Sequence, residues 1–159
     1  MSEQKIYFHD MHPAASNLSG DVITGLQQSP PSIPPKYFYD ETGSQLFDQI
    51  TELDEYYPTR TEISILQKYK RDIVDMLNKS CLLIEPGGGS CSKVCIFIDE
   101  LRPDMYVPMD ISREHLLTSA RQMSKEIPWL DIHAVCNDFT FKLTLPEGLP
   151  DSARVVFFP

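Results

Sequence analysis

The chain has 159 residues, 42% of them apolar, and its 14 basic and 23 acidic side chains leave a formal net charge of −9. This size suits one globular domain, and the acidic balance argues against nucleic acid as a partner, because a phosphate backbone attracts clustered positive charge. No apolar run approaches the roughly 20 residues that span a bilayer, and the polar start does not resemble a secretory signal, so we expect a cytoplasmic protein without membrane contact.

The four cysteines are too few and too irregularly spaced for a disulfide framework, so we interpret them as reduced thiols. Cys91 and Cys95 form a single pair, which is weak evidence for zinc. His9 and His12 lie near the N-terminus, where imidazoles are more often solvated than ligating. We therefore expect no structural metal.

The first 80 residues indicate an arm followed by helices. Residues 1–19 are expected to form a mobile N-terminal arm, and residues 20–80 a helical segment. Helices are predicted over residues 20–27, 44–53 and 59–77. A proline-rich connector separates the first two, because proline cannot continue a helix interior. Thr59 and Glu62 predict a capping box at the start of the third helix.

From residue 81 onward, strands and helices alternate. The predicted strands are 81–85, 105–110, 132–136 and 154–158, and the predicted helices are 94–101 and 116–127. Pro108 suggests a bulge or a missing ladder donor in the second strand. This alternation predicts an α/β fold with a parallel, doubly wound sheet.

The last predicted strand is apolar and would lie at an edge of the sheet. An edge strand exposes unpaired backbone groups, which complete proteins generally cover. We therefore expect a chain truncated after the fourth strand, and the exposed edge suggests dimerisation.

A glycine turn, Gly87-Gly88-Gly89, follows the first of these strands. Glycine permits positive φ and lets a ligand approach the backbone, so the turn can hold a nucleoside or amino-acid group. Lys93 lies between Ser92 and Val94, so the ending of a phosphate-binding loop is missing, and so is the third glycine of a dinucleotide fingerprint. Pyrophosphate ligands are therefore disfavoured.

Acidic residues end the next two strands. Asp110 lies 23 residues beyond Gly87, where its carboxylate could accept both ribose hydroxyls. Asp138 could accept from an adenine amino group, with the ring of Phe139 as an apolar wall. Either aspartate could instead cap the helix or turn that follows its strand. Their joint placement favours a nucleoside site.

A more specific signature lies in the helical segment. It consists of Pro34-Pro35-Lys36-Tyr37-Phe38-Tyr39-Asp40, Gly43-Ser44, Leu46-Phe47-Asp48, Ile50-Thr51 and Glu55-Tyr56-Tyr57-Pro58-Thr59-Arg60-Thr61-Glu62. This signature resembles that of the histidine-specific methyltransferases of ergothioneine biosynthesis, and it also occurs in fused ergothioneine-type or ovothiol-type enzymes. The resemblance covers residues 20–159. It implies a Rossmann-like class I methyltransferase sheet, with residues 81–159 as the first half of the cofactor-binding domain.

The resemblance also implies S-adenosylmethionine as cofactor and L-histidine as acceptor. It assigns cofactor contacts to Gly87, Gly89, Lys93, Asp110, Asp138 and Phe139, and substrate contacts to Tyr56 and Tyr39. Apart from the resemblance, Lys93 could be a solvated helix lysine and Tyr56 a core aromatic. No catalytic nucleophile is expected, because the sulfonium of the cofactor is already activated.

The chain departs from the family pattern in two ways. It has three glycines where the family usually has Gly-Ser-Gly, and it ends before the family's next motif and the later domain that holds the amino acid. We expect the intact protein to methylate the α-amine of histidine and this chain alone to be inactive. The alternatives are a methyltransferase for another small amine and a non-catalytic module for cofactor binding or interaction.

Overall fold

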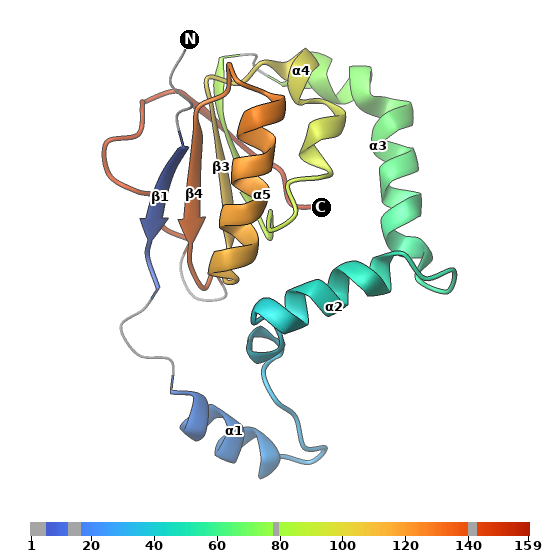
Figure 1. Ribbon diagram of the computed structural model, residues 1–159, viewed down its shortest axis with the longest axis vertical. Helices are drawn as coiled ribbons and strands as arrows, with labels where there is room; N and C mark the ends of the chain where they lie inside the picture. Colours follow the sequence, from blue (N-terminus) through green and yellow to red (C-terminus); the bar gives the residue numbers. More distant parts are fainter. Residues whose placement is uncertain (1–5, 13–16, 78–79, 140–142) are drawn as a thin grey trace.

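The computed structural model describes residues 6–12, 17–77, 80–139 and 143–159, and its centre is a five-stranded parallel sheet (Figure 1). The strands are β1 (Ile6–Asp10), β2 (Cys81–Pro86), β3 (Met105–Asp110), β4 (Ile132–Cys136) and β5 (Ala153–Val156). Their order in the sheet is β1-β4-β3-β2-β5, and every neighbouring pair is parallel. The order β4-β3-β2-β5 is that of the first four strands of a Rossmann-like sheet. The predicted fold class is therefore confirmed.

The N-terminal strand β1 was not expected. The sequence interpretation placed residues 1–19 in a mobile arm, but Ile6–Asp10 pair in register with Ile132–Cys136. The run Ile-Tyr-Phe consists of residue types that fit a pleated, half-buried surface, and Phe8 packs against the main core. β1 therefore covers the edge of β4 that would otherwise be unpaired.

The two N-terminal histidines have separate partners. His9 stacks on His133 of β4, with 3.0 Å between Nε2 of His9 and Nδ1 of His133. His12 contacts the carboxylate of Asp10 through Nδ1 at 3.0 Å. The interpretation of both imidazoles as solvated is therefore wrong for His9, which is half-buried.

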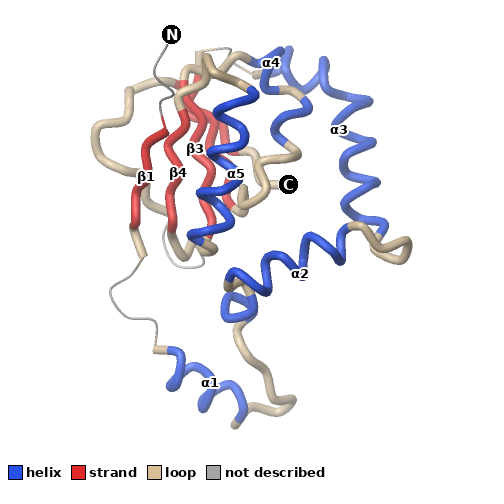
Figure 2. The backbone as a smooth tube through the Cα atoms, viewed as in Figure 1, coloured by secondary structure: helices blue, strands red, loops and turns tan. Residues whose placement is uncertain are grey.

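Helices lie on one side of the sheet and beyond the carboxyl ends of its strands, as Figure 2 shows. They are α1 (Leu18–Leu26), the 3₁₀ helix η1 (Pro35–Phe38), α2 (Glu41–Thr51), α3 (Tyr57–Met76), the 3₁₀ turn η2 (Val94–Ile96), α4 (Ile98–Leu101) and α5 (Arg113–Glu126). The helices predicted over 20–27, 44–53 and 116–127 are confirmed as α1, α2 and α5, with ends shifted by up to three residues. Over the described residues, no helix combines the length and apolar character that a bilayer crossing requires.

Two helix predictions need correction. α3 begins at Tyr57, with Pro58 in its first turn, where proline is favoured; Thr59 therefore lies inside the helix and the capping box does not form. The helix expected over residues 94–101 is split into η2 and the short α4. Its first residues include the β-branched Val94 and Ile96, which lower helix propensity.

The two faces of the sheet are covered differently. One face packs against α3, η2, α4 and α5 and forms the larger core. On the other face, Leu82, Ile84, Val107, Met109 and Val135 pack against Leu145 and Leu149 from the connection between β4 and β5. The strand order is that of a doubly wound sheet, but in the described ranges helices cover only one face.

Pro108 does not disturb the strand register. β2 pairs with β3 through the proline, with Glu85 opposite Pro108. On the β4 side, Tyr106 lies opposite Ile132 and Met109 opposite Val135, so the offset is the same before and after it. The missing donor thus interrupts the β3–β4 ladder without a bulge.

Helix α2 lies across the carboxyl ends of the strands (Figure 1). It contacts α5, and 3.8 Å separate Oδ2 of Asp48 in α2 from Nε2 of His115 in α5. Polar side chains at the strand ends therefore lie between the sheet and a helix of the N-terminal segment.

Candidate cofactor-binding site

The glycine turn lies at the point where the order of the strands changes direction in the sheet. β2 has β3 on one side and β5 on the other, and ligands of open α/β sheets bind outside the strand ends at such a point. Gly87 has a φ of +76°, which a side chain would make unfavourable. The N–H groups of Gly87 and Gly88 both donate to the carbonyl of Met109, at 2.8 and 3.1 Å. The turn therefore offers an open backbone surface at the exposed Gly87, while these two donors tie it to β3.

Two aromatic rings stand beside Gly87. A Cβ built there would lie 3.9 Å from the ring of Phe158 and 4.0 Å from that of Phe139. The two rings are 6.2 Å apart and nearly perpendicular. Phe139 was predicted as an apolar wall. Phe158 was not singled out, although its place just beyond β5 at the same switch point could have indicated it.

Asp110 lies directly against the turn. A Cβ on Gly89 would stand 2.7 Å from Oδ2 of Asp110 and 3.0 Å from the ring of His115. Oδ1 of Asp110 accepts from the N–H of Ser112 at 2.8 Å. Burial raises the pKa of Asp110, and the Ser112 N–H partly offsets that effect. Of the predicted cofactor residues, Gly87, Gly89, Asp110 and Phe139 therefore form one group.

Asp138 lies at the end of the neighbouring strand and is bound by a lysine. The N–H of Asn137 donates to the carbonyl of Asp110 at 3.0 Å, so the ends of β3 and β4 are held together. The carboxylate of Asp138 is 6% exposed, and its Oδ2 accepts from Nζ of Lys36 at 3.1 Å. The sequence shows Lys36 as part of the signature but does not reveal its contact with Asp138, because the two residues are 102 positions apart in the chain.

Lys93 also forms an ion pair with the N-terminal segment. Its Nζ lies 2.5 Å from Oε2 of Glu62 in α3. This contact joins the residues after the glycine turn to the helical segment. A cofactor contact of Lys93 remains a prediction.

The two predicted substrate residues belong to one aromatic cluster. The ring of Phe47 lies 6.0 Å from that of Tyr39 and 6.1 Å from that of Tyr56, both edge to face. Tyr39 and Phe47 also line an apolar hollow of about 470 Å³ on η1 and α2. Phe47 was part of the signature but was not named as a site residue.

A second, more polar cleft lies beside the turn. It has a volume of about 660 Å³ and separates α2 from the glycine turn and α5. Its lining includes Asp48, Ser90, Ser92 and His115. This volume is within the range of small-molecule sites, so the cleft is large enough for a nucleoside-sized ligand.

Glu85 is a buried carboxylic acid that the sequence interpretation missed. It is 2% exposed, and the hydroxyl of the fully buried Tyr106 donates to its Oε2. Burial raises the pKa of Glu85 to about 7, against the lowering effect of the Tyr106 hydrogen bond. The sequence pattern predicts Glu85 only as the end of an apolar strand, although an acid shortly before three glycines is a signal.

The strand order and the turn at the switch point define a Rossmann-like cofactor-binding domain. A sequence profile described as "Histidine-specific methyltransferase, SAM-dependent" matches residues 18–159, and the chain belongs to this family. Its cofactor is therefore S-adenosylmethionine. The resemblance drawn from the signature is thereby confirmed.

Individual relatives agree with this assignment. The chain is 41% identical over 136 residues to the histidine N-alpha-methyltransferase of Mycobacterium tuberculosis (strain CDC 1551 / Oshkosh), covering 82% of this chain and 42% of that protein. It is 41% identical over 130 residues to the enzyme of the same name from Mycolicibacterium smegmatis, covering 79% and 40%. A 4-dimethylallyltryptophan N-methyltransferase of Claviceps purpurea is 29% identical over 116 residues, covering 70% and 33%. The chain thus spans about two fifths of the length of its mycobacterial relatives.

Proposed function

We propose that this chain is the S-adenosylmethionine-binding part of an N-methyltransferase that acts on the α-amine of L-histidine. The family and the two mycobacterial relatives support the reaction and the acceptor. The structural observation that carries the proposal is the contact of Gly89 with Asp110 beside the open Gly87 at the switch point. This arrangement fits an adenosyl group, since it leaves backbone space next to a carboxylate.

Residues at the ends of different strands recognise different parts of the cofactor. Asp110 accepts hydrogen bonds from the ribose hydroxyls, and Asp138 accepts one from the adenine amino group. Phe139 and Phe158 enclose the nucleobase with apolar surface. Lys93 supplies positive charge near the turn for the cofactor's carboxylate.

The N-terminal segment receives the acceptor. Tyr56 and Tyr39, joined by Phe47, offer aromatic faces and hydroxyls that hold the amino acid. The bound cofactor supplies the activated methyl group. The residues of this chain align the amine and exclude water, which is the main requirement of an in-line methyl transfer.

Two assays test the proposal. The intact protein is incubated with S-adenosylmethionine and histidine, and the absence of methylated histidine by mass spectrometry would contradict the acceptor. For the cofactor site, Asp110→Asn should weaken S-adenosylhomocysteine binding at least tenfold in titration calorimetry, as loss of a charged acceptor does. Asp104→Asn, at the opposite end of β3, is the matched control and should bind like the unaltered protein.

A second acceptor class is favoured by one observation. The relatives include the 4-dimethylallyltryptophan N-methyltransferase named above. The cluster of Tyr39, Phe47 and Tyr56 would suit an indole as well as an imidazole. A panel of amino acids in the same assay separates the two. A protein that binds S-adenosylhomocysteine but methylates nothing would instead favour a non-catalytic binding module.

A further inference from the structure

One ion pair joins the N-terminal segment to the proposed adenine site. Lys36 in η1 and Asp138 after β4 are 14% and 6% exposed in their side chains, and 3.1 Å separate Nζ from Oδ2. The hydrogen bond to Asp138 stabilises the ammonium and raises the pKa of Lys36, so the lysine stays charged at neutral pH. This is a partly desolvated charge pair, unlike the exposed pairs of a protein surface.

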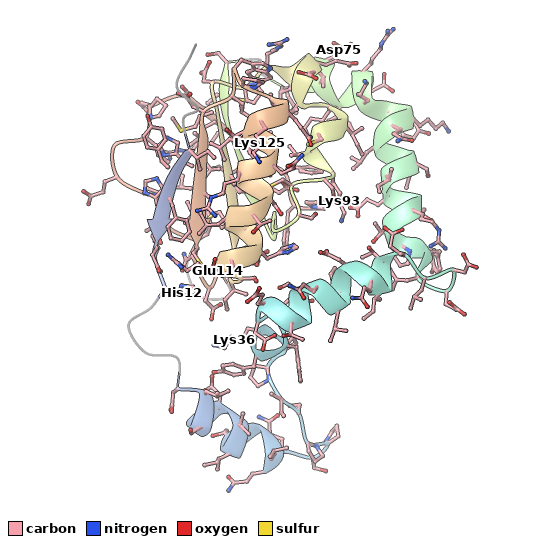
Figure 3. The ribbon with its side chains drawn as sticks, in the orientation of Figure 1. His12, Lys36, Asp75, Lys93, Glu114 and Lys125 are labelled. Carbon is pink, nitrogen blue, oxygen red and sulfur yellow. The ribbon has the colours of Figure 1, made fainter. Side chains whose placement is uncertain are left out.

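The neighbouring contacts hold Lys36 in place. Its Nζ also lies 3.7 Å from Oδ2 of Asp21 in α1, and the hydroxyl of Tyr37 donates to the same Asp21 oxygen at 2.5 Å. Asp21 thus links α1 to η1, and Lys36 links η1 to the end of β4. Figure 3 shows Lys36 beside η1, close to the start of α2.

The charge state of Asp138 decides what the carboxyl group can recognise. An ionised carboxylate only accepts hydrogen bonds, whereas a protonated one also donates. The 6-amino group of adenine is a donor, and the ionised carboxylate accepts from it in a charge-assisted hydrogen bond that is stronger than the bond to the neutral acid. A buried carboxylate becomes easier to protonate when a neighbouring positive charge is removed.

We propose that Lys36 is a positioning residue for nucleobase recognition: its ammonium orients the ionised carboxylate of Asp138 for the adenine amino group. The inference rests on the proposed cofactor site. It also joins the two halves of that site, because Tyr39, assigned to the acceptor, directly follows η1. Cofactor binding and the placement of the acceptor residues are thereby connected through one lysine.

The test compares two ligands that differ at one position of the base. S-adenosylhomocysteine has the 6-amino donor, and the corresponding purine-riboside analogue has a hydrogen atom in its place. Titration calorimetry gives both dissociation constants for the unaltered protein and for Lys36→Met, Lys36→Arg and Lys125→Met. Lys125 lies on α5, away from Lys36, and is the matched control (Figure 3).

The unaltered protein should prefer the adenosyl ligand by roughly tenfold or more, the effect of one charge-assisted hydrogen bond. In Lys36→Met this preference should fall to about twofold, while Lys36→Arg and Lys125→Met retain it. If Lys36→Met does not fold, Lys36→Gln takes its place, with folding checked by circular dichroism.

Two results would overturn the inference and are distinguishable. If the unaltered protein prefers the adenosyl ligand and Lys36→Met keeps that preference in full, Lys36 has only a structural role and the adenine site stands. If the unaltered protein shows no preference, the assignment of Asp138 to adenine is itself wrong, and the role of Lys36 falls with it.

Discussion

The carboxylate of Asp110 lies so close to the backbone of Gly89 that a Cβ on Gly89 would stand 2.7 Å from its Oδ2. That distance is shorter than the contacts that side-chain carbons make. The glycine is therefore required by the packing of the turn against the end of β3. It fixes where the carboxylate lies relative to the exposed Gly87.

Gly89→Ala should therefore disable the cofactor site. The added methyl group must push the Asp110 carboxylate or the turn aside, and we expect S-adenosylhomocysteine binding to weaken roughly tenfold or more. Ser64→Ala, at an exposed position of α3 outside the cleft, should bind normally. Titration calorimetry measures both, and normal binding by Gly89→Ala would show that the position of Asp110 does not matter for the ligand.

Glu85 should make stability depend on pH. Its pKa in the folded chain is about 7, against an ordinary value of 4.5. The unfolded chain releases the proton first, so the stabilisation is complete below pH 4.5 and is lost as the pH rises through 7. The expected loss in free energy of unfolding is about 3 kcal/mol.

Denaturant unfolding between pH 4.5 and 8 measures this effect. Glu85→Gln does not titrate. The free energy of unfolding of the unaltered protein should therefore fall by about 3 kcal/mol relative to this variant as the pH rises from 4.5 to 8. The exposed Glu147→Gln is the control and should follow the unaltered protein at every pH. A constant difference for Glu85→Gln across this range would contradict a raised pKa.

Tyr56 should act on the acceptor and leave the cofactor unaffected. In the intact protein, Tyr56→Phe keeps the ring but loses the hydroxyl, so we expect KM for histidine to rise roughly tenfold, the effect of losing one hydrogen bond to the substrate. The dissociation constant of S-adenosylhomocysteine should not change. Tyr57→Phe is the matched control, because the neighbouring Tyr57 is 67% exposed. Equal kinetics for the two variants would remove Tyr56 from the substrate site.

The edge strand β5 should cause self-association of this chain. Val156 is 58% exposed on β5, the edge strand of the sheet that the described residues form, and such edges template pairing with a second chain. Sedimentation velocity should show a mass that increases with concentration, and Val156→Lys should keep the chain monomeric. Met76→Lys, at a still more exposed residue of α3, is expected to leave the association unchanged. A monomer at all concentrations would exclude the proposed dimer edge.

The sequence predicted the sheet better than it predicted the contacts. The strands β2, β3 and β4 are buried, apolar and punctuated by turn residues, so local pattern was enough to find them. The alternation of strands with helices was enough to predict a parallel, doubly wound sheet. The glycine turn and Asp110 came together because both lie at the ends of adjacent strands.

What the sequence missed depends on long-range pairing. β1 is five residues long and is followed by neither a glycine turn nor a predicted helix, so only its pairing with β4 identifies it. The contacts of Lys36 with Asp138 and of Lys93 with Glu62 connect distant segments and leave no periodic signal. Glu85 reads as the polar end of a strand until its burial against Tyr106 is seen.

The position of β1 in the sheet has a consequence for the order of folding during synthesis. β1 leaves the ribosome long before its partner β4, which begins only at Ile132. The strand must therefore wait, unpaired, while the whole helical segment and two other strands are translated. Such distant pairing delays formation of the β1–β4 edge of the sheet, and a bulky fusion placed before Ile6 would interfere with that step.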